Sequence, residues 1–201
     1  MIDDFLRRPH TITEWAADGI RILGILSVLV AFVWLTPTDA GILALALPAL
    51  MVPRFAGARA GFDLGYGAAV VIATWSNVLD LYRTVAGWDL VMHFVTTGMI
   101  AAMAYLVLRR TRVVPGPDAP ARVPIVLVTT IGLAVCVVWE VIEWAGKTFV
   151  TDEIFVTYQD TIGDMIVGGA GGLVAAVAVS LVRIERMAST PEREDARWLR
   201  I

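Results

Sequence analysis

The chain carries little charge for its length. Only 17% of its 201 residues are Asp, Glu, Lys or Arg, whereas 58% are hydrophobic and the mean hydropathy is +0.73. A water-soluble domain of this size needs more polar surface than that to cover its core. The composition therefore excludes an ordinary soluble protein and predicts a membrane protein.

Several functional signatures are also absent. Cys136 is the single cysteine, which excludes a disulfide within the chain and any CxxC metal or redox motif. The formal net charge is −3 and no stripe of Lys and Arg with interleaved aromatics exists, so we expect no nucleic-acid partner. The hydrolase signatures GxSxG and HExxH are missing as well.

Long apolar runs are what the sequence has instead. Crossing about 30 Å of hydrocarbon takes roughly 20 mostly apolar residues in a helix. We therefore predict an all-α, six-helix transmembrane bundle with helices at about 18–36, 40–54, 65–82, 89–108, 123–146 and 160–183. Because no small-residue cleavage site follows the first run, we expect that run to be a retained helix and not a signal peptide.

The ends of these runs carry recognisable helix signals. Thr11 and Glu14 have the spacing of a capping box ahead of the first helix. The second run contains Pro48 and Pro53, so we expect it to be kinked or to stop short of a full span. We expect residues 1–201 to form a single transmembrane domain with a short tail at 184–201, where a helix starts at Ser189 or Thr190.

Arginine is distributed unevenly between the two sides of this bundle. With six spans, the N-terminus, the loops after the second and fourth spans, and the tail share one side and hold most of the arginines. The opposite side holds only Arg83 and Lys147. Cytoplasmic loops are enriched in Lys and Arg, so the pattern predicts that both termini are cytoplasmic.

Ionisable side chains gather at the arginine-poor ends of four spans. Four pairs have helical spacing there, so the members of each pair share a helix face: Asp89 and His93, Glu140 and Glu143, Asp160 and Asp164, and Asn77 and Asp80. Like charges clustered at low dielectric cannot all stay ionised, so they bind protons or cations or separate into water. Ionisable residues within membrane spans indicate a functional site by default.

Carboxylates with one imidazole suit a divalent metal ion. Oxygen ligands favour Mg, Ca or Mn, and the histidine adds Zn or Fe. Two carboxylate pairs with a bridging geometry would suit a two-metal centre, as in the hydrolysis of phosphate or acyl esters. We predict that the metal ligands are Asp89, His93, Glu143 and Asp164. The general base is predicted to be Glu140 or Asp160, and Asn77 and Asp80 are predicted to support the site.

Each of these residues also has a purely structural explanation. Glu143 and Lys147 have the order of a surface ion pair, and Asp80 could pair with Arg83. Asp160 could cap the sixth helix with Asp164 in its first turn.

Other features admit equally plain explanations. His93 could be a neutral core histidine, and GGAGG at 168–172 predicts close helix packing. Trp75, Trp88, Trp139 and Trp144 are typical of an interfacial belt. All these explanations together leave Glu140 and at least two further carboxylates without a role.

The order of these motifs resembles that of a known family. D-x-x-x-H-F (Asp89, His93, Phe94), E-x-x-E-W and D-T-x-x-D-M, followed by a Gly-rich helix, resemble the YjdF-type bacterial inner-membrane proteins. More remotely, residues 77–175 are similar to VanZ-like proteins. The resemblance implies a multi-pass protein of the bacterial cytoplasmic (inner) membrane, with the six acidic and histidine residues acting as a unit, but implies no reaction. The chain departs from the family at 155–159, where FVTYQ replaces a Gly-Asp-Trp-rich segment.

Three functions are compatible with the sequence. The first is a metal-dependent hydrolase or transferase that uses Zn, Mg or Mn on a lipid or lipid-linked envelope substrate, with the 146–159 loop gating entry. The second is a small cation- or proton-coupled transporter, although the acids lie at one end and not at the midplane. The third is a non-catalytic binding or resistance protein that holds a basic envelope ligand. The sequence indicates no oligomeric state.

Overall fold

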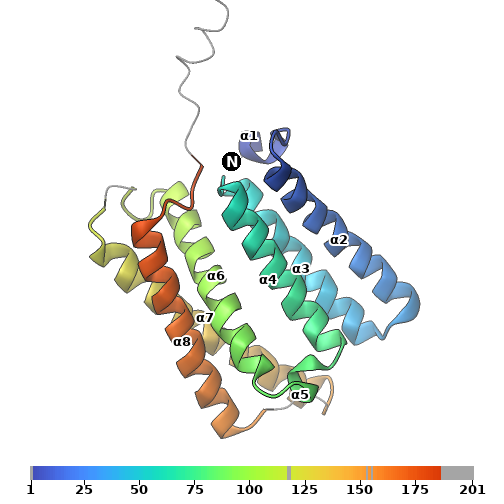
Figure 1. Cartoon of the computed structure of the whole chain (residues 1–201). Coiled ribbons are helices and arrows are strands. Elements are labelled where there is room, and N and C mark those ends of the chain that lie inside the picture. The colour runs from blue at the N-terminus through green and yellow to red at the C-terminus, as the bar shows by residue number, and fades with distance from the viewer. Residues whose placement is uncertain (1, 117–118, 153, 155, 187–201) are drawn as a thin grey trace, which may run out of the picture.

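The computed structural model is a bundle of helices, and it describes residues 2–116, 119–152, 154 and 156–186 (Figure 1). The long helices are α2 (Ile12–Trp34), α3 (Pro37–Phe55), α4 (Ala60–Val78), α6 (Trp88–Arg110), α7 (Arg122–Phe149) and α8 (Tyr158–Leu181). Two short helices, α1 (Ile2–Leu6) and α5 (Leu81–Thr84), complete the set within these residues. The predicted all-α class is confirmed.

Five of the long helices are long and apolar enough to cross a membrane: α2, α3, α6, α7 and α8. The remaining one, α4, lies alongside α2 and α3 but falls outside that group of five (Figure 1). It begins with a glycine-rich turn and carries a buried charge, Asp63. The structure thus confirms a helical protein with several membrane spans, and the count of six spans stays a prediction.

Polar caps extend the helices beyond their apolar runs. The predicted capping box at Thr11 is confirmed, because its hydroxyl accepts from the Glu14 amide at 3.2 Å and the Glu14 carboxylate accepts from the Thr11 amide at 3.2 Å. A second capping box joins Thr36 and Asp39. As a result α2 begins at 12 and not at 18, and α3 begins at 37 and continues through both prolines to 55, so the second helix does not stop short.

The predicted helix at 65–82 is wrong at its carboxyl end. α4 ends at Val78, and Asp80 adopts a left-handed backbone with φ of 55° before α5 begins. The Arg83 side chain, one turn on, donates to Asp80 Oδ1 at 2.7 Å. This hydrogen bond holds the pKa of the Asp80 carboxyl below its ordinary value. Asp80 therefore belongs to a turn and does not extend a face of α4 with Asn77.

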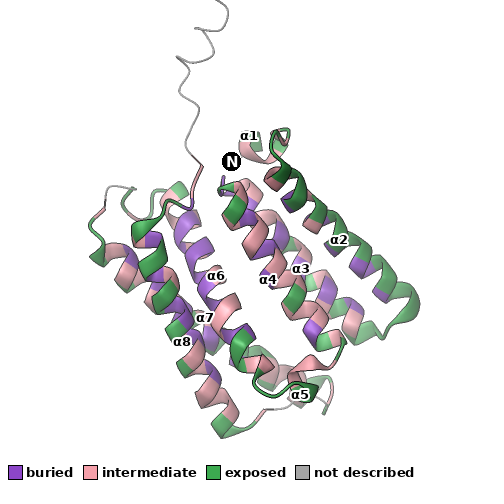
Figure 2. Ribbon diagram, in the orientation of Figure 1, coloured by how far each residue is buried: buried purple, intermediate pink, exposed green. Residues whose placement is uncertain are grey.

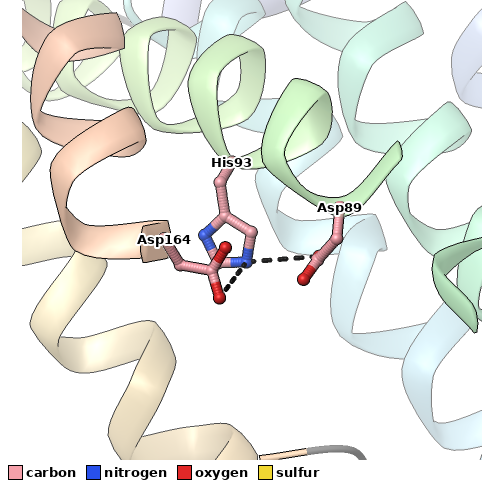
Figure 3. A group of neighbouring side chains, drawn as sticks. All are labelled: Asp89, His93 and Asp164. Carbon is pink, nitrogen blue, oxygen red and sulfur yellow. Dashed lines mark ion pairs between the residues drawn. The ribbon is translucent and has the colours of Figure 1, made fainter. Parts of the chain in front are cut away.

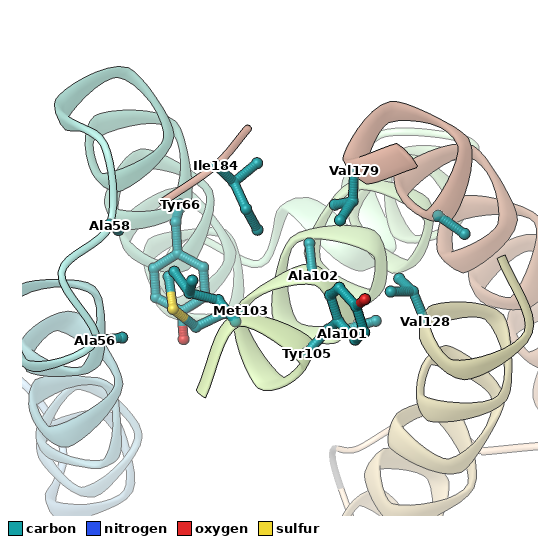
Figure 4. Packing of buried hydrophobic residues seen from close by; sticks show 12 residues of the cluster. Ala56, Ala58, Tyr66, Ala101, Ala102, Met103, Tyr105, Val128, Val179 and Ile184 are labelled. Carbon is teal, nitrogen blue, oxygen red and sulfur yellow. The ribbon is translucent and has the colours of Figure 1, made fainter. Parts of the chain in front are cut away.

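The long helices form two groups of three. α2, α3 and α4 pack on one another, as do α6, α7 and α8, and contacts of α4 with α6 join the groups (Figure 1). Alanines and larger apolar residues fill this junction, including Tyr66, Ala102 and Met103 (Figure 4). Burial is heaviest along α6, whereas much of α2 is exposed, as expected for a helix with lipid on its outer side (Figure 2).

A buried ion pair holds the first group together. The Arg21 guanidinium on α2 contacts Asp63 on α4 at 2.5 Å and Asp18 on its own helix at 2.9 Å. Its Nε also donates to the Leu50 carbonyl on α3 at 3.1 Å. Because a buried charge without a partner is strongly unfavourable, this arginine fixes the relative positions of three helices.

Both chain ends described by the structure lie at one end of the bundle. Arg54 donates to the Phe5 carbonyl at 3.2 Å, and Arg109 pairs with Glu185 at 2.7 Å. Residues 184–186 run beside residues 57–59, where Ala58 and Glu185 form an antiparallel bridge. The start of the predicted tail is thus packed on the bundle, and the helix predicted at Ser189 or Thr190 lies outside the described residues.

Glycines bring the backbones of the second group into contact. A Cβ built on Gly171 of α8 would lie 2.0 Å from the Phe94 carbonyl oxygen on α6, far closer than van der Waals contact. A Cβ on Gly132 of α7 would lie 3.0 Å from the Cα of Gly172. The close packing predicted from GGAGG is confirmed, since only glycine lets these helices approach so closely.

Gly171→Ala should therefore destabilise the protein, because the added methyl forces α8 away from α6. Overpacking typically costs about 1–3 kcal/mol, occasionally more. Gly41→Ala is the matched control, because nothing lies within 4 Å of its Cβ position and alanine favours the helix. Thermal unfolding in detergent, followed by tryptophan fluorescence, should show a lower midpoint for the first variant only. Equal midpoints for both variants would contradict the packing described.

Candidate metal centre

Three helices of the second group bring their acidic ends together at the end of the bundle opposite Arg109 and Glu185. α6 and α8 begin there, and α7 ends there (Figure 1). Because α7 runs antiparallel to α6 and α8, the predicted residues lie at a similar depth: Asp89 and His93 on α6, Glu140 and Glu143 on α7, and Asp160 and Asp164 on α8.

His93 lies at the centre of this cluster. Its buried Nε2 is 3.4 Å from Asp89 Oδ1, one turn earlier on α6, and 4.0 Å from Asp164 Oδ2 on α8 (Figure 3). One ligand atom from each of these residues lies within 4.8 Å of the others. Imidazole and two carboxylates at such distances can converge on one divalent ion.

A second group of possible ligands shares the same histidine. One ligand atom each from His93, Glu140 and Glu143 also lies within 4.8 Å of the others. The structure thus brings together four predicted carboxylates around one imidazole. Asp160 lies one turn before Asp164 but belongs to neither group within the described residues.

Two of the carboxyl groups are buried without hydrogen-bond partners. Asp164 is 1% exposed and Glu140 is 7% exposed, and none of their four oxygens accepts or donates a hydrogen bond. A buried polar group without a partner is unfavourable by about 1–3 kcal/mol, and a charged one by more. These oxygens therefore indicate a bound cation or proton.

Neighbouring side chains orient the rest of the cluster. The Trp139 indole N–H donates to Glu143 Oε1 at 2.8 Å, and Lys147 Nζ donates to the Val156 carbonyl at 3.2 Å. Cys136 lies beneath the site, 3.5 Å from the Thr97 hydroxyl. The Glu143–Lys147 ion pair considered from the sequence is not among the contacts seen in the described residues.

Part of the cluster lines a cleft of about 1090 Å³. Asp89, Glu143 and Asp160 line the cleft from the second helix group, and α3, α4 and the following turn supply the other wall. Asp160 does not cap α8, because the Thr157 hydroxyl accepts from the Asp160 amide at 3.3 Å and is itself the cap. The Asp160 side chain therefore stays available to the cleft.

The supporting residues predicted from the sequence lie on the opposite wall. Asn77 and Asp80 line the cleft but belong to neither ligand group. Sequence reasoning missed Thr36 and Asp39, which line the same wall and whose capping-box spacing could have placed them at this end. These residues make the cleft polar on both sides.

Tyr82 is a further cleft residue that the sequence gave no reason to select. Its hydroxyl donates to the Ala73 carbonyl at 2.8 Å. Burial raises the pKa of the Tyr82 phenol above its ordinary value, and the charges of Asp89 and Glu143 raise it further. The phenol therefore stays protonated and remains a hydrogen-bond donor at the rim of the site.

Comparison with known proteins gives the chain a family. No curated protein and no solved structure matches it. A family model described as a predicted membrane protein (DUF2238) matches residues 19–185, a range that includes both helix groups and every candidate ligand. The finer resemblance to YjdF-type and VanZ-like proteins stays a prediction. The chain belongs to the DUF2238 family of predicted membrane proteins.

Proposed function

We propose that this protein is a metal-dependent hydrolase or transferase that acts on a lipid or lipid-linked envelope substrate. One observation carries the proposal: Asp164 and Glu140 bury four carboxyl oxygens that have no hydrogen bond, in ligand groups whose other carboxylates, on Asp89 and Glu143, line a polar cleft. Buried groups that lower the stability of a fold are typical of functional sites. Carboxylates within a membrane-spanning region also indicate a functional site by default.

The ligand set suits a divalent ion such as Zn, Mg or Mn. Asp89, His93 and Asp164 would hold it, and a bound divalent ion polarises ester oxygens and lowers the pKa of water. The sequence alone left Glu140 or Asp160 as the general base. Glu140 lies in a ligand group and away from the cleft lining, whereas Asp160 lines the cleft, so we assign the base role to Asp160.

The assigned chemistry is ordinary ester hydrolysis. A water molecule gives a proton to the Asp160 carboxylate while its oxygen forms the new bond to phosphorus or to the carbonyl carbon. The ester bond breaks, and the departing alcohol oxygen takes up that proton from Asp160. A transferase would replace water by a second alcohol without changing the roles of these residues.

The mixed polar and apolar lining of the cleft favours an amphiphilic substrate. Its lining combines polar side chains with apolar ones such as Ile42, Leu90 and Ile154. Trp139 and Trp144 are exposed at the same end of α7, as is typical of side chains at the membrane interface. A head group would enter the cleft while its chain stays in the lipid. The gating role of the 146–159 loop stays a prediction, and residues 153 and 155 of that loop lie outside the described residues.

Transport through the second helix group is less favoured. Below the acidic end, α6, α7 and α8 are in backbone contact through Gly98, Gly132, Gly171 and Gly172. Such packing leaves no room for an ion path between these three helices in the part of the chain that the structure describes. A binding protein without catalysis would use the same cluster, and turnover distinguishes it from an enzyme.

Metal content tests the proposal directly. The protein purified in mild detergent should contain bound divalent metal by elemental analysis, and His93→Ala should lose more than about 100-fold in affinity, because indirect supporting contacts alone are worth about 10- to 100-fold. Asp80→Asn is the control, since Asp80 lies outside both ligand groups. Unfolding midpoints verify folding. Absence of metal from every preparation, including protein incubated with Zn, Mg or Mn, would refute the proposal.

Turnover tests the role of Asp160. With membrane lipid extracts as substrate, Asp160→Asn should lower product formation by about 100-fold or more, as expected when a general base is removed. Its metal content should stay equal to that of the wild type, because Asp160 is in neither ligand group. Product formation by Asp160→Asn at the wild-type rate would rule out the base role.

We also propose that the acidic end faces outward, in a bacterial cytoplasmic membrane with both termini in the cytoplasm. The arginine-rich end supports this orientation. In a Cys136→Ala background, an impermeant maleimide added to intact cells should label Asp152→Cys, which is exposed near the cleft, and should not label Arg112→Cys in the loop after α6. The reverse labelling pattern would show the opposite orientation.

A further inference from the structure

We infer that the centre holds two divalent cations and not one, an inference that rests on the proposed metal-dependent function. The first site is formed by Asp89, His93 and Asp164. Glu140 and Glu143 form the second, in the ligand group that shares His93 with the first. The cations must accept both oxygen and nitrogen ligands, and Mn²⁺ suits the ligands of both sites.

The unpaired oxygens are the first reason. A single ion in the group of Asp89, His93 and Asp164 would leave both buried oxygens of Glu140 without a partner. A single ion in the group of His93, Glu140 and Glu143 would leave both oxygens of Asp164 without one. Occupancy of both sites gives each of these buried carboxylates a cation to bind.

Charge balance is the second reason. The carboxylates of Asp89, Glu140, Glu143 and Asp164 carry four negative charges when ionised, and one divalent ion offsets only half of them. Nearby basic side chains are engaged elsewhere, since Lys147 donates to the Val156 carbonyl and Arg83 pairs with Asp80. Two divalent ions would neutralise the cluster with His93 uncharged.

The helix arrangement keeps the two sites adjacent. Asp164 lies on α8, which packs against both α6 and α7, and the two ligand groups share His93. Cys136 Sγ is 4.0 Å from the Asp164 carbonyl oxygen, and Glu140 follows Cys136 by one turn on the same face. Neither side-chain oxygen of Asp164 has a hydrogen-bond partner, so both are available to the ion of the first site.

A metal pair also narrows the substrate class. Two ions about 3.5–4 Å apart are typical of enzymes that cleave phosphate esters, because they stabilise both the attacking and the departing oxygen. Without metal, the cleft has five acidic side chains in its lining and one arginine, which would repel a phosphate. We therefore infer a phosphate-ester head group as the substrate class.

Stoichiometry tests this inference. Metal-free protein in detergent is prepared with a chelator and titrated with Mn²⁺, and bound manganese is counted by equilibrium dialysis and elemental analysis. Wild type and Asp80→Asn should bind two ions per chain and give the electron paramagnetic resonance spectrum of a spin-coupled pair. Glu140→Gln should bind one ion, with an uncoupled spectrum, because Asp89, His93 and Asp164 remain.

The outcomes separate the inference from the function on which it rests. One ion per wild-type chain would overturn the pair and leave the metal-dependent function standing. No ion in the wild type would refute both. If Glu140→Gln unfolds, Glu143→Gln replaces it, since that residue is only half-buried and serves the same second site. Two ions retained by either folded variant would also overturn the ligand assignment.

Discussion

The close approach of α8 to α6 is the constraint on which the rest of the molecule depends. Gly171 lies against the Phe94 carbonyl, and one turn earlier Gly168 lies against Thr97 and Cys136. At this spacing α8 has a single register along α6, since moving it by one residue would place a side chain against the backbone. One more turn toward the site, the same register sets Asp164 beside His93. The packing of small residues thus positions the charged ones.

That constraint also explains how two unpaired carboxyl groups can stay buried. Lipid-facing helices could rotate Glu140 or Asp164 toward the polar cleft if their packing allowed it. Contacts of Gly132 with Gly172, and of Gly168 with Cys136, hold those faces inward. In the first helix group, by contrast, the buried Asp63 carboxylate forms an ion pair with Arg21. The fold thus gives one buried carboxylate a close ion pair and leaves two others without a hydrogen bond, which under the proposed function are the ones available to a ligand.

Part of this arrangement could be predicted from the sequence, because some signals are local. A capping box, a glycine cluster and pairs of polar residues one turn apart are read from neighbouring residues, and the Thr11 capping box and the GGAGG packing followed as expected. The break at Asp80 did not, because it depends on a left-handed residue stabilised by Arg83 and not on hydropathy.

Other features could not be predicted for a different reason. The cleft position of Tyr82, and the fact that Glu140 is buried whereas Asp160 faces the cleft, depend on how distant helices meet. A helical wheel shows that two acids share a face, but only packing decides which of them is buried.

The two helix groups contribute different parts of the candidate site. Every candidate ligand lies on α6, α7 or α8, which are locked by backbone contact, so the ligand geometry cannot change easily. The opposite wall of the cleft comes from α3, α4 and the turn at Asp80, and it meets the ligand group mainly through α4 and α6. At the far end, residues 184–186 beside residues 57–59 join the groups again. Small movements about that junction would change the width of the cleft and leave the ligands in place. Under the proposed function, substrate selection would therefore vary through the first helix group while the chemistry of the second is preserved.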